Sequence, residues 1–202
     1  MTKKHKTTTN LTKINELKLK AQSLKVPILS DDGLLFLVET LKKHNVKNIL
    51  EIGTAVGYSA ISMAYHTGAK VTSIERNPEL YALAVKHVID FEMNPQITLM
   101  FADALTCELD SNLRFDAIFI DAAKAQYEKF FNKYEPFLTE SGIIITDNLN
   151  FHNVDVDTVS RGTKNLVKRL ESFKQFLKSH VDYESELYNI GDGMSISQRI
   201  KS

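Results

Sequence analysis

Five short apolar runs, rich in β-branched residues, recur along the first three quarters of the chain. Each run is continuously hydrophobic rather than alternating, which is typical of strands buried on both faces of a parallel sheet. The segments between them have helical spacing: Asn77 and Pro78 indicate the start of one helix, and Gly68 the end of another. Repeated strand and helix units predict a doubly wound α/β sheet with right-handed crossovers. The predicted strands are 48–53, 70–75, 97–103, 115–121 and 142–148.

The last quarter of the chain has a different pattern. Residues 161–180 place apolar side chains on one helical face and basic side chains on the other. Segments 183–190 and 194–200 then alternate in the manner of strands around the turn Asp192-Gly193. An antiparallel hairpin is therefore expected to complete a mostly parallel seven-stranded sheet with helices on both faces. A further helix is predicted near the N-terminus, over about 10–24.

Composition narrows the class of protein. A chain of 202 residues that is 43% hydrophobic suits one domain with a substantial core. No apolar run approaches the roughly 20 residues of a membrane span, so a cytoplasmic protein without membrane contact is predicted. Cys107 is the only cysteine, which excludes an internal disulfide and a thiolate metal centre. The six histidines lie too far apart for a helical histidine pair.

The formal net charge of zero conceals two basic segments. Residues 1–25 contain seven lysines and one glutamate, and residues 161–180 contain six lysines or arginines and one glutamate. Clustered cations of this kind favour a phosphate-facing surface, because they release counterions from nucleic acid. Solvated helix faces explain the same pattern, and charge alone leaves the choice open.

Acidic or amide side chains stand at the end of every predicted parallel strand: Glu51, Glu75, Asp103, Asp121, Asp147 and Asn148. Ligands of open α/β sheets bind outside these carboxyl ends. Gly53 and Gly57 allow close backbone approach there, although Ala55 interrupts the glycine spacing of dinucleotide sites. Glu75 suits the hydroxyls of an adenosine ribose, and Asp103 with Ala104 suits an adenine edge. Taken singly, each acid has the alternative role of a helix N-cap.

Two neighbouring strand ends suggest a metal site. Asp121 ends one strand, and Asp147 with Asn148 ends the next, so two carboxylates and an amide are expected in one small volume. Carboxylates that close repel unless a cation lies between them, and three oxygen ligands with open positions suit Mg²⁺. Lys124 would lie at the rim of this site, where it could accept a proton from a substrate hydroxyl. The alternatives are a simple turn at 147–148 and a helix lysine paired with Glu128.

These residues carry a resemblance to a known family. The stretches "EIGTAVGYSAI", "FIDAAKAQY" and "IIITDN", within a match from about Val26 to Ile200, resemble the cation-dependent class I O-methyltransferases that use S-adenosylmethionine. That group contains the catechol and caffeoyl-CoA methyltransferases. Within it, "VPIL", "DAAKAQY" and "GDGMSIS" look most like the bacterial tRNA 5-hydroxyuridine methyltransferases, which make 5-methoxyuridine at the anticodon wobble position.

The resemblance implies a Rossmann-like methyltransferase domain over 26–202, preceded by a basic segment and helix over 1–25. It implies Mg²⁺ ligands at Asp121, Asp147 and Asn148, with Asp121 also catalytic, and Lys124 as candidate general base. It also implies a homodimer. Asn153 departs from the family pattern, where relatives often carry glycine, so the substrate loop is expected to differ in shape. The implied cofactor site comprises Leu29, Gly53, Tyr58, Ser59, Glu75, Asp103, Ala104 and Asp121, and the strand-end pattern adds Glu51.

The predicted function is O-methylation of 5-hydroxyuridine in the tRNA anticodon loop, with S-adenosylmethionine and Mg²⁺ as cofactors. Arg161, Lys164 and Lys168 are the candidate RNA contacts. A small-molecule methyltransferase of the catechol type is the main alternative. A non-catalytic RNA-binding protein with a relic cofactor fold is disfavoured because both metal carboxylates and Lys124 are present. An NAD-linked oxidoreductase is disfavoured by the interrupted glycine spacing.

Overall fold

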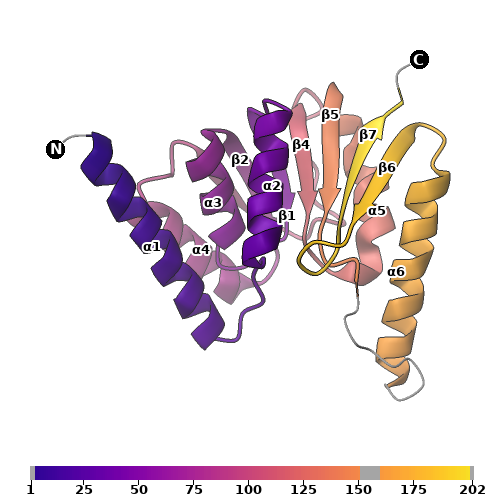
Figure 1. Cartoon of the computed structure of the whole chain (residues 1–202), viewed down its shortest axis with the longest axis horizontal. Helices are drawn as coiled ribbons and strands as arrows, with labels where there is room; N and C mark the ends of the chain where they lie inside the picture. The colour runs from indigo at the N-terminus through magenta and orange to yellow at the C-terminus, as the bar shows by residue number, and fades with distance from the viewer. Residues whose placement is uncertain (1–2, 151–159, 201–202) are drawn as a thin grey trace.

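The computed structural model describes residues 3–150 and 160–200, which form one seven-stranded sheet flanked by helices (Figure 1). The strand order is β3-β2-β1-β4-β5-β7-β6, and β7 is antiparallel to both of its neighbours. This confirms the predicted parallel sheet with a C-terminal antiparallel hairpin. The strands are β1 (Asn48–Ile52), β2 (Lys70–Glu75), β3 (Ile97–Phe101), β4 (Phe115–Ile120), β5 (Leu138–Thr146), β6 (Tyr183–Tyr188) and β7 (Met194–Arg199).

Six α-helices and two short 3₁₀ helices accompany the strands in the described part of the chain. The N-terminal helix begins before the predicted boundary near residue 10, and β5 begins four residues before the predicted 142. The α-helices are α1 (Lys3–Ser23), α2 (Asp31–Lys43), α3 (Tyr58–Thr67), α4 (Pro78–Asp90), α5 (Tyr127–Tyr134) and α6 (Arg161–Ser179), and the 3₁₀ helices are η1 (Lys124–Gln126) and η2 (Glu135–Phe137).

The sheet separates two hydrophobic cores, which explains the continuous apolar runs. Successive side chains of a strand point to opposite faces. In β4, Ala117 and Phe119 join the core beneath α1 to α4, whereas Ile118 and Ile120 join the core beneath α5 and α6. All four side chains are fully buried. Burying each large one contributes about 1.5–3 kcal/mol, so a polar residue in either set would be costly.

Local signals in the sequence set the helix boundaries on either side of β2. The Asn77 side chain accepts hydrogen bonds from the backbone N–H groups of Glu79 and Leu80, at 2.9 and 3.0 Å. This N-cap confirms the predicted start of α4. Gly68 has a φ of 73° and ends α3, as predicted, because a left-handed residue terminates the helical hydrogen-bond ladder.

The two basic segments lie at opposite ends of the sheet: α1 flanks the end that carries β3 and β2, and α6 lies beside β6 (Figure 1). They therefore do not merge into one basic surface. α1 is nevertheless part of the fold, because Ile14, Leu17 and Ala21 are buried in the first core. Over residues 3–150 and 160–200, no helix has the length and apolarity needed to cross a membrane.

Candidate active site

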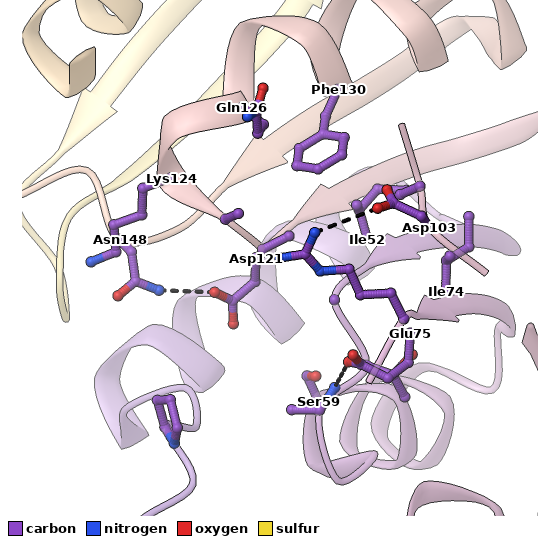
Figure 2. Close-up of a pocket in the computed structure, with 18 of the residues that line it drawn as sticks. Ile52, Ser59, Ile74, Glu75, Asp103, Asp121, Lys124, Gln126, Phe130 and Asn148 are labelled. Carbon is purple, nitrogen blue, oxygen red and sulfur yellow. Dashed lines mark hydrogen bonds and ion pairs between the residues drawn. The ribbon is translucent and has the colours of Figure 1, made fainter. Parts of the chain in front are cut away.

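A cavity of about 560 Å³ opens at the carboxyl ends of the parallel strands β1 to β5. Its wall contains most of the predicted cofactor residues, together with Lys124 and Asn148. Asp147 and Glu51 do not line it. The predicted residues in the wall are Leu29, Gly53, Tyr58, Ser59, Glu75, Asp103, Ala104, Asp121, Lys124 and Asn148. Of the strand-end residues, Glu75, Asp103, Asp121 and Asn148 line this cavity, which is drawn in Figure 2.

The glycine turn between β1 and α3 forms the floor of this cavity. Gly53 has a φ of 103°, and a Cβ built there would lie 2.0 Å from the backbone oxygen of Asp121. Only glycine permits this approach of β1 to the segment after β4. Gly57 has a φ of 86° and precedes α3, whose first two residues, Tyr58 and Ser59, line the cavity.

Glu75 holds the glycine turn in place from the end of β2. One carboxylate oxygen accepts a hydrogen bond from the Ala55 N–H, and the other accepts from the Asn77 N–H, both at 2.8 Å. A carboxylate offers about four acceptor positions. Glu75 therefore retains acceptor capacity toward the cavity for the two hydroxyl groups of a ribose.

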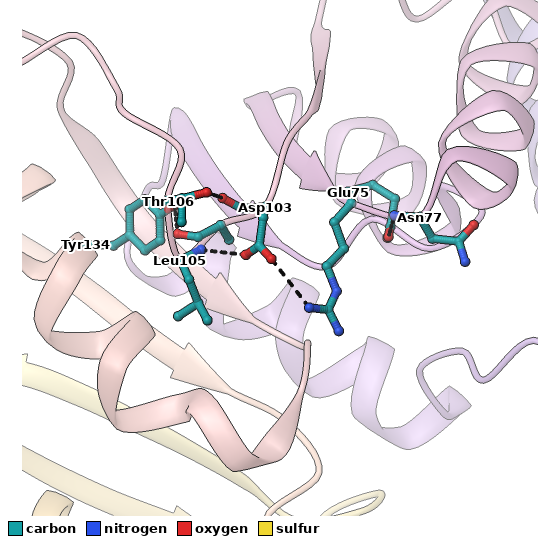
Figure 3. Close-up of polar contacts among 8 residues, drawn as sticks. Glu75, Asn77, Asp103, Leu105, Thr106 and Tyr134 are labelled. Atoms are coloured by element: carbon teal, nitrogen blue, oxygen red, sulfur yellow. Dashed lines mark hydrogen bonds and ion pairs between the residues drawn. The ribbon is translucent and has the colours of Figure 1, made fainter.

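Asp103 forms the next part of the wall, after β3 (Figure 3). Its Oδ1 accepts from the Leu105 N–H at 2.8 Å, and its Oδ2 lies 3.4 Å from the Arg76 guanidinium. The Tyr134 hydroxyl donates to the Ala104 carbonyl at 2.7 Å. These bonds fix the backbone of 103–105 as a firm edge beside the cavity, the position predicted to face adenine.

Asp121, Asp147 and Asn148 meet where β4 and β5 end side by side. The Asn148 Nδ2 donates to Asp121 Oδ1 and to Asp147 Oδ2, each at 2.9 Å (Figure 2 shows the first of these bonds). Asn148 has a φ of 62°, a conformation that asparagine tolerates better than most residues. The structure thus brings together the three side chains predicted as metal ligands.

Burial raises the pKa of both carboxyl groups in this cluster. Burial is the main cause for Asp121, and the nearby Lys124 ammonium opposes the rise in its pKa. Burial also dominates for Asp147, and repulsion from Asp121 raises the pKa further. Two buried carboxyl groups that share one amide nitrogen are poorly compensated, so a positive charge between them would stabilise the ionised pair.

Both the sequence and the fold of this chain are similar to those of known proteins. The sequence profile of the O-methyltransferase family matches residues 2–200. The chain belongs to this family. It is 29% identical over 186 residues to a caffeoyl-CoA O-methyltransferase of Medicago sativa, covering 85% of this chain and 74% of the relative. A Staphylococcus aureus protein, provisionally named a caffeoyl-CoA O-methyltransferase, superposes with a TM-score of 0.88 at 36% identity, covering 93% of this chain and 92% of that one.

A less similar solved structure has the same fold. An O-methyltransferase from Bacillus cereus, crystallised with S-adenosylhomocysteine, superposes with a TM-score of 0.78 at 21% identity, covering 94% of this chain and 91% of that one. At that identity the likeness concerns the fold, which it confirms as Rossmann-like.

The donor set of this O-methyltransferase fits a hard divalent cation. Asp147 Oδ1 is buried and has no hydrogen-bond partner among the described residues. A half turn of the Asn148 amide would present its Oδ1 in place of Nδ2 to the same space. Across 3–150 and 160–200 there is no cluster of three or more His, Cys, Asp or Glu side chains suited to a metal. Within these residues, the candidate site has only three donors, the two carboxylates and one amide. Such a set would leave coordination positions for water or substrate, as Mg²⁺ prefers.

Replacing Asp147 by asparagine tests this fit. Asp147→Asn should weaken binding of Mn²⁺, used as a spectroscopic substitute for Mg²⁺, by about 100-fold or more, since it removes a ligand charge rather than an outer-shell partner. Mn²⁺ electron paramagnetic resonance titration measures the affinity without any turnover. Asp90→Asn, at the exposed end of α4, is the matched control. Equal Mn²⁺ affinities in the wild type and Asp147→Asn would contradict the metal site.

Glu51 lies behind the cavity wall rather than in it. Its carboxylate is fully buried, and Oε2 accepts a hydrogen bond from the Ser73 hydroxyl, which in turn contacts the Thr54 hydroxyl. Glu51 lies in β1 two residues before Gly53 and pairs with Ser73 of β2. Through Ser73 and Thr54 its side chain supports the glycine turn from the side away from the cavity. Burial raises the pKa of Glu51 to about 7, while the Ser59 and Ser73 hydroxyls oppose the rise.

This raised pKa predicts a pH-dependent stability. Because the native carboxyl binds its proton more tightly than the unfolded one, its contribution is present below pH 4.5 and is lost as pH rises through about 7. At about 1.4 kcal/mol per pKa unit, the change is about 3 kcal/mol. Urea unfolding at pH 5 and 8 should therefore show a smaller loss of stability in Glu51→Gln than in wild type. Glu140→Gln, at an exposed site, should keep the wild-type slope; a wild-type slope in Glu51→Gln would contradict the effect.

Several residues of the cavity wall were not predicted. Arg76, Gln126, Phe130 and Asp192 all line it. Asp192 was predicted only as a turn residue. It reaches the site because β7 pairs with β5, and the Asn150 N–H donates to the Asp192 carbonyl at 2.8 Å. The predicted substrate-loop difference at Asn153 lies outside the described residues.

The three predicted RNA contacts lie on α6 and do not line the cavity. Arg161 and Lys168 are exposed, and Lys164 is half-buried. A neighbouring cation that was not among them, Arg169, reaches the cavity wall: its Nη1 donates to the Ala125 carbonyl at 3.3 Å.

Proposed function

We propose that this O-methyltransferase transfers a methyl group from S-adenosylmethionine to the 5-hydroxyl oxygen of 5-hydroxyuridine at the tRNA wobble position. The observation that carries the proposal is that Asp121, Asn148 and Lys124 line one cavity with Glu75 and Asp103. Asp147 lies directly behind this wall, where its carboxylate accepts a hydrogen bond from Asn148. One side of the cavity suits an adenosine, and the other suits a substrate with two adjacent oxygens. A homodimer and a cytoplasmic location stay predictions.

The chain's own residues would perform three tasks in this reaction. Glu75 and Asp103 hold the nucleoside part of the cofactor, and the glycine turn admits its amino acid part. Asp121, Asp147 and Asn148 would hold Mg²⁺, which would supply positive charge that favours the ionised form of a substrate hydroxyl. Lys124 would accept the hydroxyl proton at Nζ when its side chain is in the neutral amine form. The cofactor supplies an electrophilic methyl group on its sulfonium sulfur. The carbon–sulfur bond breaks as the oxygen–carbon bond forms, and S-adenosylhomocysteine is released.

The choice of 5-hydroxyuridine rests on chemistry and on the basic helix. Its C5 hydroxyl and C4 carbonyl oxygens are adjacent, as are the two hydroxyls of catechol, so the same donor cluster serves either substrate. An anticodon base is already exposed and can enter a cavity at low cost in unstacking energy. Arg169 on the basic helix α6 contacts Ala125 of the cavity wall, where flanking phosphates would pass. The resemblance in the motifs to the tRNA enzymes adds to this support.

Nucleoside mass spectrometry of tRNA tests the proposal. Transfer RNA from a strain that lacks this protein should accumulate 5-hydroxyuridine and lose 5-methoxyuridine. The purified protein should then methylate that tRNA with labelled cofactor, in the presence of Mg²⁺. Unchanged nucleosides, together with activity on a panel of catechols and caffeoyl-CoA, would instead establish the small-molecule alternative. Absence of any methyl transfer, with RNA binding retained, would favour the non-catalytic one.

A further inference from the structure

Arg169 connects helix α6 to the rim of the cavity. Its guanidinium Nη1 donates to the Ala125 carbonyl at 3.3 Å, and Ala125 lies between Lys124 and Gln126 in the cavity wall. The side chain is exposed, so it reaches this carbonyl across the surface rather than through the core. Among the basic residues of α6, this one is therefore placed beside the turn that carries the candidate base.

The position of Arg169 is held by the buried face of the same helix. Leu170 and Phe173 follow it and are 1% and 2% exposed. Phe173 meets Tyr127 edge to face, with ring centroids 5.5 Å apart, and Tyr127 donates a hydrogen bond to the Asp147 carbonyl at 2.9 Å. These contacts fix the position of α6 relative to the end of β5. A shift of Arg169 along the cavity rim would disturb this packing.

The Arg169 guanidinium has further N–H donors that could bind a ligand. It carries five N–H groups, of which one is directed at the Ala125 carbonyl. The remaining donors form a planar fork that matches two oxygens of a phosphate, and Arg is preferred for such contacts. The neighbouring Lys168 is also exposed, which adds a second positive charge on the same stretch of helix.

A nucleotide in the cavity would bring phosphates to this rim. A base that enters the cavity remains joined to the chain by a phosphodiester on each side, and these charged groups stay in solvent at the mouth. We propose that Arg169 binds a phosphodiester that flanks the methylated nucleotide, and so distinguishes an RNA strand from a free nucleoside or a phenol. This inference rests on the proposed tRNA function.

Two substrates that share the reactive base separate this role from a structural one. The substrates are an anticodon stem-loop oligonucleotide that contains 5-hydroxyuridine, and the free nucleoside. In Arg169→Ala, the ratio of stem-loop to nucleoside kcat/KM should fall by about 10-fold or more, as expected for loss of a charged hydrogen bond. The slope of log Kd against log salt for the stem-loop should fall by about one. Arg169→Lys should retain part of the ratio, and Lys178→Ala, exposed at the far end of α6, should retain all of it.

The outcomes also separate this inference from the proposed function. An equal loss on both substrates, which leaves the ratio unchanged, would show that Arg169 only positions the Lys124 turn, and would overturn the inference. Wild-type kcat/KM and wild-type Kd for the stem-loop in Arg169→Ala would overturn the inference as well. If the wild type binds the stem-loop by fluorescence anisotropy but does not methylate it, the proposed function fails, while weaker binding by Arg169→Ala still supports the phosphate contact. Absence of stem-loop binding by the wild type would overturn both.

Discussion

Replacing Lys124 with methionine should lower kcat by about 10²–10⁴-fold, the usual contribution of a positioned proton acceptor. Lys124 begins η1, lines the cavity beside Asn148, and acts electrostatically on Asp121 and Asp147 (Figure 2). Methionine preserves much of the length and apolar contact of the stem but cannot take up a proton. Single-turnover methyl transfer, measured with saturating substrate and cofactor, reports the chemical step directly.

The control for Lys124 is cofactor affinity in the same variant. Calorimetry with S-adenosylhomocysteine should give a Kd within about threefold of wild type, because Glu75, Asp103 and the glycine turn are untouched. Lys129→Met, an exposed site on α5, should have wild-type kcat. A variant at Lys124 that keeps its kcat would remove this residue from the proton transfer. A variant that loses both kcat and cofactor binding would indicate a structural role in the wall.

The parts of this molecule that were predictable depend on local periodicity. The strands were predictable because their side chains pack into a core on each face of the sheet. Every position in a run such as 117–120 is therefore apolar. The proximity of Asp121 to Asp147 and Asn148 followed from one further rule, that parallel strands end at the same edge of a sheet. Both arguments need only the order of residues along the chain.

The parts that were missed depend on which surfaces meet in three dimensions. Arg169 and Ala125 are 44 residues apart, and their contact depends on how α6 packs beside η1. Asp192 enters the wall only because β7 is inserted between β5 and β6. Glu51 is the reverse case, a residue that was predicted in the site but lies outside the cavity wall. Its strand-end position suggested cofactor contact, but its side chain hydrogen-bonds to Ser73. No pattern along the chain distinguishes these arrangements.

The second large effect is expected at Gly53, where the cavity floor meets β4. A Cβ at this position would lie 2.0 Å from the Asp121 carbonyl oxygen and 2.9 Å from its carbon, and both of these are backbone atoms. They cannot yield easily, because the Asp121 N–H donates to the Ile52 carbonyl at 3.0 Å and the Gly53 N–H donates to the Ile74 carbonyl at 3.0 Å. Alanine would also be strained at a φ of 103°.

Gly53→Ala should therefore destabilise the fold by about 2–5 kcal/mol, from overpacking and backbone strain together. Urea unfolding measures this loss. In the folded fraction, displacement of Asp121 should weaken S-adenosylhomocysteine and Mn²⁺ binding at the same time, since one residue borders both sites. Gly68→Ala is the matched control: its φ is 73°, but a Cβ there meets nothing within 4 Å, so only the strain of about 1 kcal/mol remains. Equal stability of the two variants would contradict this prediction. It would show that the ends of β1 and β4 can separate, and that close contact between Gly53 and the Asp121 backbone is not required.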